Sequence, residues 1–110
     1  MRGILEILAM EQELRAEQVR AEVTALVEEG RRLADKGKAA EAAQQFQASL
    51  LRMPNRAASL LGAARAAAKA GDQEAARRHY ATLAEVWKDA DPSLPELAEV
   101  RTYLSGVPAR

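Results

Sequence analysis

An internal repeat with a period of about thirty-four residues restricts the fold of this chain more than any other feature of its sequence. Residues of similar type recur at this interval, and the equivalent pairs are Leu26 and Leu60, Arg31 and Arg65, Gly37 and Gly71, Ala42 and Ala76, and Phe46 and Tyr80. Such a period is typical of stacked helical hairpins, in which each unit buries its apolar face against the next. The sequence therefore predicts an all-α fold built from consecutive helix pairs.

The composition also favours helix throughout the chain. Of 110 residues, 48% are hydrophobic but only 4% are aromatic, because alanine is the commonest apolar residue. Alanine loses no side-chain entropy on entering a helix, and β-branched residues are few. We expect one small domain without strands.

The first helix is expected to be unusually long. No proline or loop cluster interrupts residues 3–35, which predicts one helix of roughly thirty residues and about 50 Å. Its first turns are apolar on two sides of the cylinder, along one stripe of Ile4, Leu5 and Leu8 and a second stripe of Ile7, Met10 and Leu14. Such an end is rarely left in water, so these six residues are expected to mediate self-association.

Turn and capping residues divide the rest of the chain into four shorter helices. Gly37 can take a positive φ and ends the first helix, and Gly71 repeats this turn before Asp72, which is suited to N-capping. Ser93 and Glu96 have the spacing of a capping box. The expected helices are residues 39–53, 56–70, 73 to about 87 or 89, and 95–104.

The spacing of small, aromatic and proline residues resembles that of the tetratricopeptide repeat (TPR) family. The matching residues are Gly30, Leu33, Gly37, Ala42, Phe46 and Pro54 in the first copy, and Gly71, Ala76 and Tyr80 in the second. The resemblance covers about residues 23–88 and implies a fragment of a right-handed superhelical α-solenoid. The implied divisions are an N-terminal helical arm at 1–22, TPR-like repeats at 23–54 and 55–92, and a C-terminal capping helix with its tail at 93–110.

Three departures from the family pattern are informative. Glu29 stands where the family prefers leucine, and an alanine pair at 63–64 replaces a Leu-Gly pair. Lys88 stands in place of the terminal proline, which lets the second helix of the second repeat run one turn further, to Pro92.

Two repeats are at the lower limit of independent stability, since each unit is stabilised chiefly by its neighbour. Some other element must therefore cover the N-terminal face. A straight, continuous helix cannot fold back onto its own repeat, so we expect the arm to pair with a second copy in a two-fold homodimer.

Charge is balanced overall but unevenly distributed. Sixteen basic residues match sixteen acidic ones, which gives no reason to expect nucleic acid or a membrane as partner. Residues 1–29 carry three Arg against seven Glu, whereas residues 30–90 carry eleven basic residues against six acidic ones. The arm is acidic and the repeat body basic. The sequence shows no cysteine, signal peptide or spanning segment, so a cytoplasmic location is the expectation.

The catalytic and metal-binding candidates are weak, so we expect no enzymatic activity, cofactor or metal. His79 is the only histidine and has no carboxylate nearby in sequence that could orient it. The stretch from Gly30 to Lys38 lacks the glycine spacing, the following Ser or Thr and the preceding strand of a phosphate loop. Trp87 is expected to pack against the helix that follows Pro95.

The TPR resemblance implies a concave groove that receives an extended peptide or a partner helix. The residues at groove positions are Thr24, Val27, Glu28, Arg31 and Asp35 in the first copy, and Ala58, Leu61, Gly62, Arg65 and Lys69 in the second. Arg31 and Arg65 are equivalent, and such a pair could receive a carboxylate in bidentate fashion. The alternative is that Arg31 pairs along its own helix and Arg65 is solvated. In this family, binding of chaperone C-terminal tails uses a cluster rich in lysine and asparagine. Val27 and Gly62 stand at two of those positions here, so a chaperone tail is not expected as the ligand.

Three functions remain open at this point. The preferred one is a non-enzymatic protein–protein interaction scaffold that self-associates through its N-terminal helix. The second is a peptide-binding adaptor that uses the groove residues Val27, Glu28, Arg31, Leu61, Arg65 and Lys69. The third is an accessory or regulatory domain of a larger enzyme.

Overall fold

Five helices make up the described part of the chain. The computed structural model describes residues 3–90 and 93–106, and within these ranges there is no strand. The helices are α1 (Ile4–Asp35), α2 (Ala39–Arg52), α3 (Ala57–Lys69), α4 (Gln73–Val86) and α5 (Pro95–Leu104). The all-α expectation is confirmed.

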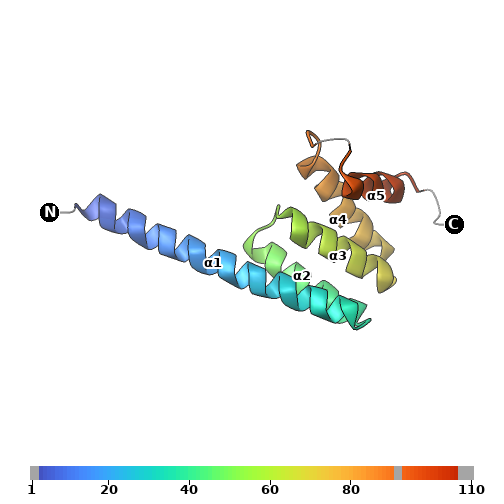
Figure 1. The fold of residues 1–110 in the computed structure, drawn as a ribbon, viewed down its shortest axis with the longest axis horizontal. Coiled ribbons are helices and arrows are strands. Elements are labelled where there is room, and N and C mark those ends of the chain that lie inside the picture. Colours follow the sequence, from blue (N-terminus) through green and yellow to red (C-terminus); the bar gives the residue numbers. More distant parts are fainter. Residues whose placement is uncertain (1–2, 91–92, 107–110) are drawn as a thin grey trace.

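Each helix packs against the next one along the chain, and α1 also touches α3. α2 and α3 lie against the C-terminal half of α1, α4 and α5 stack beyond them, and the N-terminal half of α1 projects away from all four (Figure 1). The molecule is consequently elongated, with extents of 66 × 32 × 21 Å.

The two glycine turns expected from the repeat have the same geometry. Gly37 and Gly71 have φ values of 78° and 88°, a region that residues with a Cβ rarely adopt. In both turns the amide that follows the glycine donates to a carbonyl of the preceding helix, at 2.9 Å. Asp72 caps α4 as expected, since its Oδ1 accepts from the amide of Ala75 at 3.0 Å.

One aromatic ring joins α1, α2 and α3. Phe46 on α2 is 3% exposed and lies against Gly30 of α1 and Gly62 of α3. A Cβ at Gly30 would come within 2.8 Å of the ring, and one at Gly62 within 2.3 Å. Glycine is therefore required at both positions, because only a bare backbone leaves room for the ring.

The C-terminal part of the body has its own apolar cluster. Tyr80 and Leu83 of α4 pack with Leu60 of α3 and Val100 of α5, and Trp87 is partly buried against them. The cluster that Trp87 packs against thus includes one residue, Val100, of the helix that follows Pro95.

Two expectations about the ends of helices were wrong. α4 ends at Val86 instead of extending toward Pro92, because Trp87 turns into the cluster with Val100 and the chain continues as turns. Residue 92 itself lies outside the described residues. α5 begins at Pro95 as expected, but its N-cap is Leu94, one residue later than the capping-box spacing implied.

Candidate interaction surfaces

The N-terminal part of α1 is the most exposed apolar surface of the molecule. Within the N-terminal arm expected at residues 1–22, the side chains of residues 4–18 are all exposed, and Val19 is the first that is partly buried. From here on, the arm means residues 4–18. Its large apolar side chains are between about half and four fifths exposed: Ile4 76%, Leu5 81%, Ile7 50%, Leu8 46%, Met10 47% and Leu14 58%. The six residues expected to mediate self-association are thus all accessible.

The arm leaves the body at a defined point. Arg52, the last residue of α2, forms an ion pair with Glu22 of α1 at 2.7 Å. The next residue of α1, Val23, is fully buried in the cluster around Phe46. The packed body, made of the four shorter helices and the part of α1 that they cover, therefore begins at about Glu22. None of the four shorter helices covers the arm, which lies before this point.

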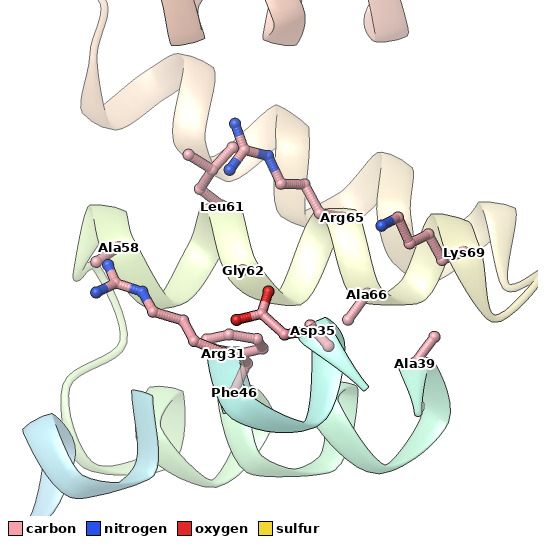
Figure 2. A pocket seen from close by; sticks show the side chains of 11 residues that line it. Arg31, Asp35, Ala39, Phe46, Ala58, Leu61, Gly62, Arg65, Ala66 and Lys69 are labelled. Carbon is pink, nitrogen blue, oxygen red and sulfur yellow. The ribbon is translucent and has the colours of Figure 1, made fainter. Parts of the chain in front are cut away.

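The second candidate surface is a hollow of about 550 Å³ between α1 and α3, with the largely buried ring of Phe46 at its floor (Figure 2). Its lining residues are Arg31, Ala34, Asp35, Ala39, Phe46, Ala58, Leu61, Gly62, Arg65, Ala66 and Lys69. Arg31 and Lys69 lie toward opposite ends of this groove, and the carboxylate of Asp35 lies between them (Figure 2). The floor is apolar and the rim carries both signs of charge.

Four of the six residues expected in the groove do line it, namely Arg31, Leu61, Arg65 and Lys69. Val27 does not, because it is 3% exposed and packs in the core with Phe46. Glu28 is exposed but does not line the hollow.

Phe46 was expected only as a residue of the repeat pattern, and its place at the floor of the groove was not predicted. The available signal was the glycine on α3, since Gly62 uncovers one edge of the ring.

Arg65 is already engaged within the chain. Its guanidinium donates to both carboxylate oxygens of Glu99 on α5, with Nε to Oε2 at 2.9 Å and Nη2 to Oε1 at 2.6 Å. The hydroxyl of Tyr80 donates to the same carboxylate at 2.7 Å. These hydrogen bonds, first of all those from Arg65, hold the pKa of Glu99 below its usual value. Burial, followed by the hydrogen bond to Glu99, raises the pKa of Tyr80.

The paired arginines expected in the groove are thus not equivalent. Arg65 forms an ion pair with Glu99 of α5, whereas no ion pair to Arg31 or Lys69 occurs within residues 3–90 and 93–106. A carboxylate ligand in the groove would therefore meet Arg31 and Lys69 as its available cations.

A smaller hollow of about 410 Å³ lies between α2 and α4. It is lined by Gln47, Leu50, Leu51, Arg78 and His79. Leu51 is 86% exposed, and the Nε2 atom of His79 is buried without a hydrogen-bond partner among the described residues. Burial, followed by the nearby Arg78 charge, lowers the pKa of His79.

The described residues contain no group of three or more His, Asp or Glu side chains that could hold a metal ion. In the same part of the chain, no helix is both long enough and apolar enough to cross a membrane. Comparisons with protein-family models, with curated proteins and with solved structures found no match to this chain.

Proposed function

We propose that this chain is a non-enzymatic protein–protein interaction module, made of two TPR-like helical hairpins and a capping helix, which self-associates through its arm. The TPR-like assignment is supported by the repeated glycine turns at 37 and 71 and by the order of packing from α1 to α5. It is also supported by Phe46 between two glycines, since small residues facing an aromatic one set the distance between helices in such repeats.

Self-association rests on one observation: six large apolar side chains of the arm are 46–81% exposed within fifteen residues. Full burial of one such side chain contributes about 1.5–3 kcal/mol. Covering the exposed parts of all six would therefore contribute on the order of 5–10 kcal/mol, which is comparable with the stability of a small domain. The proposed occupant of this surface is the arm of another copy, because the other elements of the same chain lie at the opposite end of α1 (Figure 1).

The test is the solution mass of the full chain by light scattering at micromolar concentration. A mass above that of the 11.9 kDa protomer supports the proposal. Deleting residues 1–14 should then return the chain to the mass of a monomer. A monomeric full chain, or a deletion that leaves the oligomer intact, contradicts it.

A second candidate function, peptide binding, is favoured by the groove. A segment with an apolar side chain over Phe46 and a carboxylate near Arg31 or Lys69 fits its lining. We expect the Arg31→Ala, Lys69→Ala double variant to weaken binding of an acidic, apolar-containing peptide. The matched control is Arg77→Ala, which removes an exposed cation of α4 that does not line the groove. Equal affinity for both variants and the unchanged chain would exclude the groove as the site.

A further inference from the structure

The two apolar stripes of the arm face different directions. The first stripe is Ile4, Leu5 and Leu8, and the second is Ile7, Met10 and Leu14. At about 100° per residue, Leu8 and Leu14 point about 120° apart round the helix, and Leu5 and Met10 about 140° apart. The apolar surface of the first turns therefore extends round more than half of the circumference.

One partner helix covers only a narrow stripe. A two-stranded coiled coil buries two positions per heptad, and a helix facing one core has an apolar stripe of roughly 100°. The second stripe has such a spacing, with Ile7, Met10 and Leu14 separated by three and four residues. The first stripe remains exposed when the second is covered, so a single neighbour leaves part of the arm in water.

A second neighbour also adds contact area. A helix of fifteen residues is about 22 Å long, and with a diameter of about 10 Å its side has a surface of roughly 700 Å². One stripe covering a third of this surface buries roughly 230 Å² per chain, whereas stable interfaces bury about 800 Å² per partner. Two neighbours raise the buried area to roughly 460 Å² per chain, which is twice what one neighbour gives but still less than a standard interface buries.

The charges beside the second stripe favour an antiparallel copy of the same arm. When Met10 faces Leu14 of an antiparallel partner, Glu6 lies beside Arg20 of the partner subunit, and the reciprocal pair forms as well. A parallel arrangement would instead bring Glu6 next to Glu11 of the partner subunit. The antiparallel arrangement retains two approaches of like charges near the two-fold axis, one between the two Glu13 side chains and one between the two Glu11 side chains.

We propose that the arms of four copies form an antiparallel four-helix bundle, in which each arm uses its two stripes for two different neighbours. This inference rests on the proposed self-association and specifies its stoichiometry and geometry. The second stripe meets its counterpart in an antiparallel neighbour, and the first stripe meets its counterpart in a parallel neighbour. One two-fold axis then runs across the bundle and the other along it, so the axes intersect and the assembly closes at four subunits. The repeat bodies lie outside the bundle, two at each end.

The experiment measures the mass of the full chain and of two double variants that each place two charges in one stripe. The unchanged chain should be a tetramer of 4 × 11.9 = 47.6 kDa. Leu5→Glu with Leu8→Glu removes the first contact, and Met10→Glu with Leu14→Glu removes the second. Each double variant should be a dimer of 2 × 11.9 = 23.8 kDa, and the fourfold variant a monomer. Thr24→Glu is the control, since it adds a charge to an exposed position of α1 beyond the arm and should leave the tetramer intact.

The outcomes separate this inference from the proposed function. A dimeric unchanged chain overturns the four-helix bundle while self-association through the arm survives. Monomers from both double variants would also overturn it, since they indicate one continuous interface. A monomeric unchanged chain overturns both proposals, and its partition onto phosphatidylcholine–phosphatidylserine vesicles would assign the arm to a membrane surface instead. Because all four substituted side chains are 46–81% exposed, helix content by circular dichroism should be unchanged in every variant.

Discussion

Arg65 of α3 and Glu99 of α5 form a two-pronged ion pair, and Tyr80 of α4 donates a third hydrogen bond to the same carboxylate. Three helices thus converge on one side chain at the rim of the groove. Glu99 binds the guanidinium of Arg65, which the sequence suggested as a binding group for a ligand. This ion pair attaches α5 to the second helical hairpin.

This network should contribute measurably to stability. Removing the hydroxyl with Tyr80→Phe should cost about 1 kcal/mol, because Tyr80 is 4% exposed and the bond is made to a charged acceptor. Glu99→Gln should also cost about 1 kcal/mol, since half of the Arg65 side chain remains in contact with water and screening weakens the pair. Urea unfolding of the two single variants and of the double variant checks this. The double variant should lose less than the sum of the single losses, and strict additivity would show that the three groups do not act together.

The contact between Phe46 and Gly62 predicts a destabilising alanine. Gly62→Ala would place a Cβ 2.3 Å from the ring, so the free energy of unfolding should fall by about 1–3 kcal/mol despite the better helix propensity of alanine. Gly30→Ala should cost less, because its closest approach is 2.8 Å.

A second substitution tests whether the ring is the cause. Phe46→Leu alone opens a cavity and destabilises the protein, but combined with Gly62→Ala it provides room for the new methyl group. The double variant should therefore be more stable than the sum of the two single effects predicts. A Gly62→Ala protein as stable as the unchanged chain would show that the ring moves aside at no cost.

Stability should decrease in mildly acidic solution because of His79. Its pKa is lowered in the folded state, so the unfolded chain binds a proton more readily as the pH falls below the usual value of 6.5. This contribution to stability is complete above pH 6.5 and is lost as the pH falls toward the folded-state pKa. Glu99, whose pKa is also lowered, adds a second loss only below its usual value of 4.5.

Thermal unfolding at pH 7.5 and pH 5.2 measures the His79 effect separately from that of Glu99. The difference in midpoint between the two pH values should shrink in His79→Gln, which keeps a polar side chain that does not titrate. An unchanged difference would mean that another group is responsible.

The antiparallel bundle makes a prediction about Glu13. Glu13→Gln removes one of the two approaches of like charges at the two-fold axis, which should strengthen association by about two- to five-fold, equivalent to roughly 0.4–1 kcal/mol. Glu28→Gln is the matched control, because it removes the same charge from α1 outside the overlap of the arms. Dissociation on dilution, followed by light scattering, distinguishes the two variants. Equal changes in both would indicate a general effect of net charge.

Much of the fold could be predicted because local signals determine it. The turn at Gly37 requires a positive φ, and Asp72 offers a carboxylate that caps α4. The stretch before Gly30 contains no glycine or proline that would end the helix after Ile4. The all-α class and the limits of the five helices, to within a few residues, followed from these signals. The extension of α4 toward Pro92 did not follow, since the helix ends at Val86 and the chain continues as turns.

The groove was harder to predict because it depends on contacts between distant residues. From their positions in the repeat, Arg31 and Lys69 were expected among the groove residues, and both line the hollow. It could not show that Val27 would be buried, or that a carboxylate thirty-four residues away would bind Arg65. Both depend on how the helices are placed relative to one another, which a pattern along one helix does not contain.

The uninterrupted course of α1 has a consequence for any assembly of this chain. One helix carries both the arm and one wall of the groove, with no glycine or proline between Ile4 and Glu29 to act as a joint. Each residue inserted into the arm would move the groove about 1.5 Å further from its neighbours and rotate it by about 100°. The length of a single helix thus sets both the spacing and the direction in which several grooves are presented to a multivalent ligand.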